Sequence, residues 1–237
     1  MNLLLLDGDD FIAEGRARVA GRRLRHVREI VRADVGDTLR VGRVDGPVGS
    51  GRILTLTDDA LEIEVTFDQR PPDPVPVTLV FALPRPPTLR KVLQQATAMG
   101  VKRFVAIGAK RVERSYWTSK ALRPEALRDD LLLGLEQARD TALPIFEAWP
   151  RLAAFRRERW PELRAGGRAV LADAEAELCW PRELGAAPVI LVVGPEGGFI
   201  PEEVAAWRDG GCEVVSLGPR TLRVETAVVA LLGRLLG

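Results

Sequence analysis

The sequence predicts a two-part α/β protein, with a small β-barrel in the first third of the chain and a parallel sheet covered by helices after it. Three observations support this fold class. Short strands fill residues 3–67, a proline-rich segment follows at 69–76, and strands then alternate with helical sequence to the end. Strand–helix alternation is typical of a parallel sheet with helices on both faces. The hydrophobic content of 46% is sufficient for a core in each part.

The first part is expected to contain short strands that are bounded by turn residues. The predicted strands are 3–6, 16–19, 38–44, 52–56 and 61–67, with a turn over 45–51. One helix is predicted over residues 24–32, because apolar residues recur there with helical spacing and arginines lie between them. Its buried face is expected to hold Leu24, Val27, Ile30 and Val31.

The segment QRPPDPVP, residues 69–76, predicts a domain boundary. Its four prolines remove amide donors and stop both helices and central strands. We expect a barrel at 1–70, a linker at 71–76 and an α/β domain at 77–237. The strands predicted in the second domain are 77–83, 103–107, 168–172, 189–193 and 213–217. The predicted helices are 88–99, 124–140, a helix that contains Trp149 and Phe155, and 226–236. A short strand is expected before the helix that contains Trp149. The last helix is apolar enough to require burial against the sheet or another subunit.

Two glycine-rich loops are the most distinctive feature of the second domain. The first glycine loop, residues 194–199, follows the strand 189–193, and the second glycine loop, residues 218–225, follows the strand 213–217. Ligands of parallel sheets bind beyond the carboxyl ends of the strands, and glycine lets backbone groups approach a ligand closely. Neither loop matches a P-loop or a dinucleotide-binding fingerprint. The loops therefore predict a small-molecule pocket built largely of backbone.

The charge distribution distinguishes one stretch of the barrel. The chain has 34 basic and 33 acidic residues, yet residues 16–43 contain nine arginines and three acids. Such a stretch can bind phosphates through planar guanidinium groups, or it can be a solvated face of a protein that uses 30 arginines and 4 lysines. One histidine and two distant cysteines leave no material for a metal site or a disulfide framework. No signal peptide or membrane span is recognisable, so we expect a cytoplasmic protein.

The two glycine loops carry a resemblance to a known family. GPEGGF in the first loop and LGPRTLRVETA around the second resemble the signature of the SPOUT methyltransferases and, within them, of the ribosomal RNA small subunit methyltransferase E family. Thr221 and Val224 stand where that family usually has isoleucine and threonine. Residues 25–37, 111–115 and 136–139 are similar to further family motifs, so the resemblance covers nearly the full length.

One segment, residues 85–101, departs from the family pattern. Arg90 stands in place of an acid, Gln95 in place of a lysine and Ala98 in place of a second acid. This departure leaves open a non-catalytic RNA-binding or ribosome-assembly factor with the same fold. A SPOUT methyltransferase that acts on another base or on a ribose hydroxyl is the other alternative.

The resemblance implies a trefoil-knot (SPOUT) domain at the carboxyl end, a PUA-like barrel that binds RNA, and a homodimer formed through the knot. It further implies S-adenosyl-L-methionine in the two loops and methylation of N3 of one uridine in 16S ribosomal RNA near the decoding centre, without a metal. The implied cofactor contacts are Gly194, Pro195, Glu196, Gly197, Gly198, Leu217, Gly218, Arg220, Leu222 and Arg223.

The catalytic residues that follow from the resemblance are Arg223, Glu225 and Arg139. A guanidinium beside uracil would stabilise the anion that forms as N3 loses its proton. Glu225 is the candidate base, or equally the partner of a loop arginine in an ion pair. Arg139 and Gln137 are expected near the pocket mouth, or in salt bridges on a helix surface. The expected RNA contacts are Arg16, Arg18, Arg22, Arg23, Arg25, His26, Arg28 and Arg114.

Overall fold

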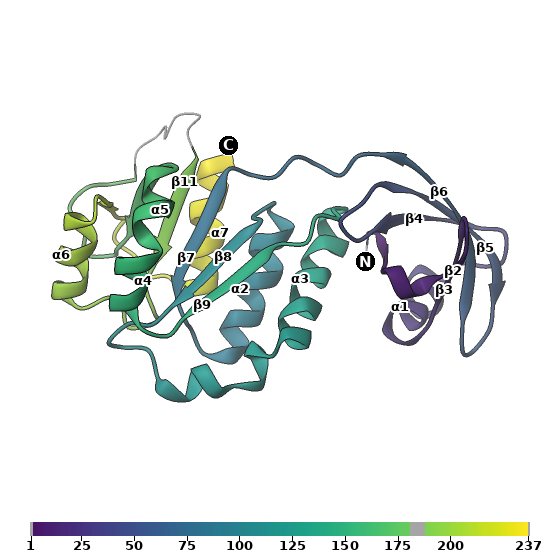
Figure 1. Ribbon diagram of the computed structural model, residues 1–237, viewed down its shortest axis with the longest axis horizontal. Helices are drawn as coiled ribbons and strands as arrows, with labels where there is room; N and C mark the ends of the chain where they lie inside the picture. The colour runs from purple at the N-terminus through teal and green to yellow at the C-terminus, as the bar shows by residue number, and fades with distance from the viewer. Residues whose placement is uncertain (1, 181–187, 237) are drawn as a thin grey trace. The chain divides into compact units, whose positions relative to one another are not determined.

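The structure is a computed structural model that describes residues 2–180 and 188–236 (Figure 1). It divides into two compact units. The barrel unit comprises the chain up to Asp73 together with Leu131–Leu143, and the α/β unit comprises Pro74–Asp130 together with the chain from Pro144 onward. The division between Asp73 and Pro74 falls within the proline-rich segment. Residues 131–143, however, belong with the barrel although they lie far beyond that segment.

The barrel unit is a six-stranded sheet in the order β1-β4-β5-β6-β3-β2. Its strands are β1 (Leu4–Leu6), β2 (Phe11–Ala13), β3 (Arg16–Val19), β4 (Thr38–Arg43), β5 (Val48–Leu56) and β6 (Leu61–Gln69). β1 pairs with β4 in parallel, and the other pairs are antiparallel. Alternate residues such as Leu61, Ile63 and Val65 are buried, because successive side chains of a strand point to opposite faces.

Two features of this sheet differ from the sequence expectation. β2 was not predicted, and β5 begins at Val48, inside the residues predicted as a turn. The glycines of that stretch serve a close strand contact: a Cβ on Gly49 would lie 1.9 Å from the carbonyl oxygen of Thr66. A glycine-rich sequence that suggests a turn is therefore part of a tightly paired strand here.

The predicted helix is divided in two, and half of its predicted buried face is wrong. The α-helix α1 spans Gly21–His26, and a π-helical turn, η2, continues over Val27–Val31. Leu24 and Val27 are buried as predicted, but Ile30 and Val31 are 68% and 44% exposed. A π-helical turn is wider than an α-helical turn, so the residues after Val27 no longer follow the 3.6-residue spacing on which the prediction rested.

Residues 131–143 enter the barrel unit through the end of helix α3 (Pro124–Ala138). Leu135 packs with Leu3, Leu5 and Val48 in one buried cluster. Beside it, the buried carboxylate of Glu136 accepts two hydrogen bonds from the guanidinium of Arg22, at 2.9 and 2.8 Å. The bidentate pair provides a charged partner for a carboxylate whose side chain is only 3% exposed.

The α/β unit is built on a parallel sheet in the order β12-β10-β11-β7-β8-β9. The strands are β7 (Val77–Ala82), β8 (Arg103–Ile107), β9 (Ile145–Trp149), β10 (Arg168–Ala172), β11 (Val189–Val193) and β12 (Glu213–Val215). Every residue of β11 is buried, because helices cover both faces of the sheet. The parallel sheet predicted from strand–helix alternation is confirmed.

Helices of the α/β unit pack on both sides of this sheet (Figure 1). They are α2 (Pro86–Ala98), the first half of α3, α4 (Leu152–Glu158), α5 (Trp160–Ala165), α6 (Pro201–Asp209) and α7 (Val224–Leu236), with 3-10 turns η3 (Arg114–Thr118) and η4 (Lys120–Leu122). The apolar α7 packs against α2. Trp149 ends strand β9, so its predicted place in a helix is wrong; it contacts Phe155 of α4 edge to face. No helix among the described residues is long and apolar enough to cross a membrane.

Candidate active site

Three loops of the α/β unit, after strands β7, β11 and β12, lie at the carboxyl edge of the sheet. The loop after β7 leads into α2 at Arg85, the first glycine loop follows β11, and the second glycine loop follows β12 after Ser216 and Leu217. Parallel strands place these loops at one edge, which is the usual ligand site of such sheets. The topology of the sheet therefore places the loops at the edge where the sequence predicts a pocket.

The first glycine loop is fixed by its own backbone and by one aromatic ring. The amide of Gly198 donates to the carbonyl of Pro195 at 2.8 Å, and Gly198 has a φ of +73°, which favours glycine. A Cβ on Gly194 would lie 3.2 Å from the ring of Phe199. Phe199 is buried and packs against Trp207 of α6, with ring centroids 5.9 Å apart. The loop is therefore anchored in the core at Phe199 while Glu196 and Gly197 stay exposed.

Side chains and backbone around α2 and β8 hold the exposed tip of this loop. The carboxylate of Glu196 accepts a hydrogen bond from the amide of Arg85 at 3.1 Å, at the residue that precedes α2. The guanidinium of Arg111 donates to the carbonyl of Gly197. Glu196 was expected to serve a cofactor; its observed contact connects the loop to the start of α2.

The second glycine loop begins with a small turn and ends in α7. The hydroxyl of Ser216 accepts from the amide of Gly218 at 3.0 Å, and Gly218 has a φ of +120°. Arg220, Leu222 and Arg223 are exposed. No ion pair is found for the two arginines within residues 2–180 and 188–236. Both guanidinium groups are exposed to solvent.

Glu225 lies in the first turn of α7 and is paired with Lys91 of α2. The Nζ of Lys91 donates to Oε1 of Glu225 at 3.2 Å, and the Glu225 side chain is 9% exposed. A hydrogen bond from its own backbone amide, together with Lys91, holds the pKa of Glu225 below its ordinary value, although burial acts in the opposite direction. The ion pair expected with a loop arginine is made instead by Lys91. A carboxylate held ionised in this way is a weak base. Its ion pair with Lys91 joins the end of the second glycine loop to α2.

The structure assigns the other predicted catalytic residue, Arg139, to the barrel unit. Arg139 follows α3 with a φ of +59°, a left-handed conformation that is uncommon outside glycine. Its side chain is exposed, and its neighbour Gln137 accepts a hydrogen bond through its backbone carbonyl from Asn2. Arg223 and Glu225 belong to the α/β unit. The predicted catalytic set is thus divided between the two units.

The predicted RNA contacts divide into residues that form ion pairs and residues that do not. Arg16, Arg22, Arg23 and Arg28 form ion pairs with Glu62, Glu136, Asp10 and Asp58 respectively. Arg23 also donates to the carbonyl of Leu5 at 2.6 Å and is partly buried, so its guanidinium is engaged within the protein. Burial lowers the pKa of His26, which keeps it neutral at pH 7. In the described chain no ion pair involves Arg18, Arg25 or Arg114, all of which are exposed.

Sequence reasoning missed Lys91 and the network of the altered segment 85–101. Arg90 and Gln94 both donate to Oδ1 of Asp130, at 3.2 and 2.7 Å, and the Asp130 side chain is 5% exposed. Arg90, which stands in place of an acid, is therefore part of a hydrogen-bonded network around Asp130. In the sequence, Lys91 stood out only because lysine is rare in this chain.

No group of three histidine, cysteine or acidic side chains that could hold a metal ion occurs in the described part of the chain. The two cysteines are free; Cys212 is buried, and burial raises its pKa to about 12. Neither residue lies in the glycine loops.

Comparison with known proteins identifies the class. Residues 71–236 match the model of the RNA methyltransferase domain family, which covers most of the chain. The chain therefore belongs to the RNA methyltransferase family. It is 27% identical to ribosomal RNA small subunit methyltransferase E of Treponema pallidum over 239 residues, covering 97% of this chain and 88% of that protein. The protein of the same name from Mycobacterium bovis is 33% identical over 171 residues, 69% of this chain and 63% of that protein. The family resemblance seen in the loop sequences is confirmed.

Solved structures share the fold over nearly the full chain. Ribosomal RNA small subunit methyltransferase E from Neisseria gonorrhoeae, solved bound to S-adenosyl methionine, has a TM-score of 0.74 at 19% identity, covering 98% of this chain and 95% of that chain. A methyltransferase from Legionella pneumophila, in complex with the same cofactor, has a TM-score of 0.75 at 19% identity with the same coverage. The predicted fold class, a trefoil-knot α/β domain with a small barrel-like domain, is confirmed.

Proposed function

We propose that the protein transfers a methyl group from S-adenosyl-L-methionine to N3 of one uridine in 16S ribosomal RNA. The observation that carries the proposal is the pair of glycine loops at one sheet edge, with the sequences GPEGGF and LGPRTLRVETA, in a chain that belongs to the RNA methyltransferase family. The relatives named for small-subunit ribosomal RNA support the substrate, and the two structures bound to S-adenosyl methionine support the cofactor.

The geometry of the loops fits this cofactor. A Cβ on Gly218 would meet nothing within 4 Å, and one on Gly198 would meet only the tip of Arg111, so there is open space above both loops. Backbone groups of residues 194–198 and 217–222 are proposed to hold the adenine and amino acid ends of the cofactor. When bound, the cofactor supplies an electrophilic methyl group on a sulfonium cation. The protein's task is to hold the donor and align uracil N3 behind the methyl.

Arg223 and Arg220 are assigned the electrostatic part of the chemistry. Their exposed guanidinium groups lie in the second glycine loop and would stabilise the negative charge that develops on uracil as N3 loses its proton. Glu225, ionised and paired with Lys91, holds the loop in place. Arg139, exposed in a left-handed conformation beyond α3, is proposed to contact the RNA substrate.

The protein acts as a homodimer in the cytoplasm under this proposal. The apolar α7, whose Leu236 is 46% exposed, offers surface for a second copy. Arg18 and Arg25 on the barrel and Arg114 on the α/β unit are proposed to contact RNA. Arg16, Arg22 and Arg28 contribute less, because their charges are already paired.

The test is methyl transfer to 16S ribosomal RNA from cells that lack the gene, followed by mass analysis of the nucleosides. We expect 3-methyluridine at one position. A methylated ribose or another base would redirect the proposal to a different target, and the absence of any cofactor affinity in calorimetry would identify a non-catalytic RNA-binding factor.

A further inference from the structure

The segment that joins β8 to α3 exposes a run of cations. Over residues 110–123 the sequence KRVERSYWTSKALR contains one acid, Glu113. The five basic residues of this stretch, all exposed, are Lys110, Arg111, Arg114, Lys120 and Arg123. We call residues 110–123 the basic segment.

The cations of the basic segment are not neutralised by the protein. None of the five forms an ion pair with another residue in the described chain. Arg111 contacts a backbone carbonyl, that of Gly197, and Lys110 is held through its amide, which donates to Glu203 at 2.8 Å. The carboxylate of Glu113 accepts a hydrogen bond from Ser115 instead of meeting an arginine. The positive charge of the segment therefore remains available to an anionic partner.

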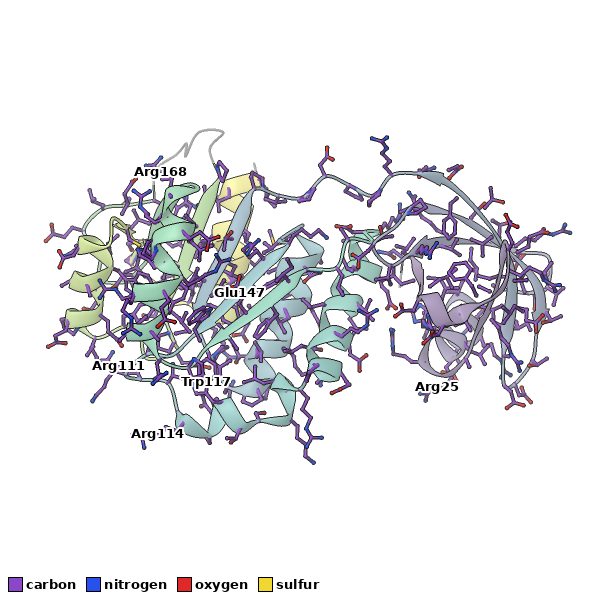
Figure 2. The ribbon with its side chains drawn as sticks, in the orientation of Figure 1. Arg25, Arg111, Arg114, Trp117, Glu147 and Arg168 are labelled. Atoms are coloured by element: carbon purple, nitrogen blue, oxygen red, sulfur yellow. The ribbon has the colours of Figure 1, made fainter. Side chains whose placement is uncertain are left out.

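The backbone of the basic segment is well defined. It forms the two 3-10 turns η3 and η4, and the hydroxyl of Ser119 caps the second turn by accepting from the amide of Ala121 at 3.2 Å. Tyr116 and Trp117 are half-buried in the first turn. Figure 2 shows Arg111, Arg114 and Trp117 at the same edge of the α/β unit. Cations interleaved with aromatic rings are typical of surfaces that bind single-stranded RNA.

The basic segment is also adjacent to the candidate active site. It begins just after the carboxyl end of β8, at the sheet edge that carries the glycine loops, and Arg111 contacts the first of these loops directly. A strand of RNA held here would pass beside the loop to which we assign the cofactor.

We propose that the basic segment is the main phosphate-binding surface of the α/β unit and that it holds the single-stranded backbone of the RNA next to the methylated base. The inference rests on the proposed function in that its partner is substrate RNA. It adds a surface: of the five cations, only Arg114 was a candidate RNA contact from the sequence. Each phosphate contact on a single strand contributes about 0.7 to the slope of log affinity against log salt.

The experiment compares two triple variants that remove the same charge from the full-length protein. Arg114→Gln/Lys120→Gln/Arg123→Gln removes three unpaired cations of the basic segment. The control, Arg16→Gln/Arg28→Gln/Arg157→Gln, removes three arginines that are paired with Glu62, Asp58 and Glu158. Binding of a 16S ribosomal RNA transcript is measured between about 50 and 200 mM salt, with cofactor calorimetry and circular dichroism as checks of folding.

We expect the salt slope to fall by about 2 in magnitude for the basic-segment variant and by less than about 1 for the control. Cofactor affinity should stay unchanged in both. Equal slopes for the wild type and the basic-segment variant, or a larger loss in the control, would overturn the inference, as would a wild type that binds the transcript without salt dependence.

Methyl transfer by the wild type is measured in parallel, because it separates the two proposals. Transfer with unchanged RNA slopes would sustain the proposed function and reject the basic segment. Absence of transfer with a reduced slope in the basic-segment variant would reject the proposed chemistry and sustain the RNA surface.

Discussion

Two basic regions of this protein have similar compositions and opposite environments. Residues 16–43 contain nine arginines, four of which form ion pairs with acids, while Arg40 donates to Gln69 and Arg43 lies over the ring of Phe11 at 5.5 Å. The basic segment contains five cations with no ion pair among the described residues. A count of charges along a sequence therefore overestimates the free positive charge of the barrel. The acids that form ion pairs with these arginines come from positions as distant as Glu136.

The paired arginines of the barrel also differ among themselves. Arg28 meets Asp58 at 2.7 Å, but the Asp58 side chain is 89% exposed, and ion pairs in water contribute little. Arg22 meets Glu136, whose side chain is 3% exposed and loses its charged partner if Arg22 is removed. Exposure of the acid decides whether an arginine is needed for folding. The following variants test the distinction between paired and unpaired cations, from the largest expected effect to the smallest.

Arg223→Ala removes an unpaired cation at the candidate active site. We expect kcat to fall about 100-fold or more, because the charge that develops on uracil loses its stabilising partner. Stability should hardly change, since Arg223 is exposed. Single-turnover methyl transfer measures the effect, and Arg157→Ala, at an exposed ion pair with Glu158, is the control. If Arg223→Ala transfers methyl groups at the normal rate, its assignment as a catalytic residue is wrong.

Arg22→Ala removes a paired cation and leaves Glu136 buried without its guanidinium. We expect the free energy of unfolding to fall by about 2 kcal/mol, less than for a fully buried pair because Arg22 is itself half-exposed. Urea denaturation measures the loss. Arg28→Ala, whose partner is exposed, should change stability by less than about 0.5 kcal/mol. Equal losses in the two variants would contradict the role given to the exposure of the acid.

Lys91→Met removes the paired cation of the active site. We expect cofactor affinity to fall about 10-fold, because Glu225 loses its partner and the second glycine loop loses an anchor. Lys91→Arg should restore most of the affinity. Removal of a positive partner also raises the pKa of Glu225 from its lowered value.

The pH dependence of this variant has a defined sign. A lowered pKa contributes stability that is present above the ordinary carboxyl pKa of about 4.3 and is lost as pH falls through the folded value. Cofactor binding by Lys91→Met should therefore weaken at a higher pH than binding by the wild type during acid titration. Identical profiles would show that Lys91 does not act through Glu225.

Arg18→Gln/Arg25→Gln removes two unpaired cations of the barrel and should have the smallest effect. We expect the salt slope of RNA binding to fall by about 1 and the unfolding transition to stay in place. A loss greater than that of the basic-segment triple would make the barrel the principal RNA surface.

Much of the fold could be predicted because its signals are local. Apolar alternation predicted β3 and β6, strand–helix alternation predicted the parallel sheet, and both glycine loops were located from the residues that flank them. The errors occurred where local spacing was misleading. The π-helical turn exposed Ile30, and the glycines before residue 52 served strand pairing instead of a turn.

The sequence by itself determined most of the strands, the two loops and, through the loops, the family. Only the tertiary structure decided which charges are free: that Lys91 pairs with Glu225 across 134 positions, and that Arg22 pairs with Glu136 across 114. Periodicity records neighbours three or four residues apart along a helix and two apart along a strand. An ion pair between distant segments depends on how those segments pack, so it leaves no trace in local spacing.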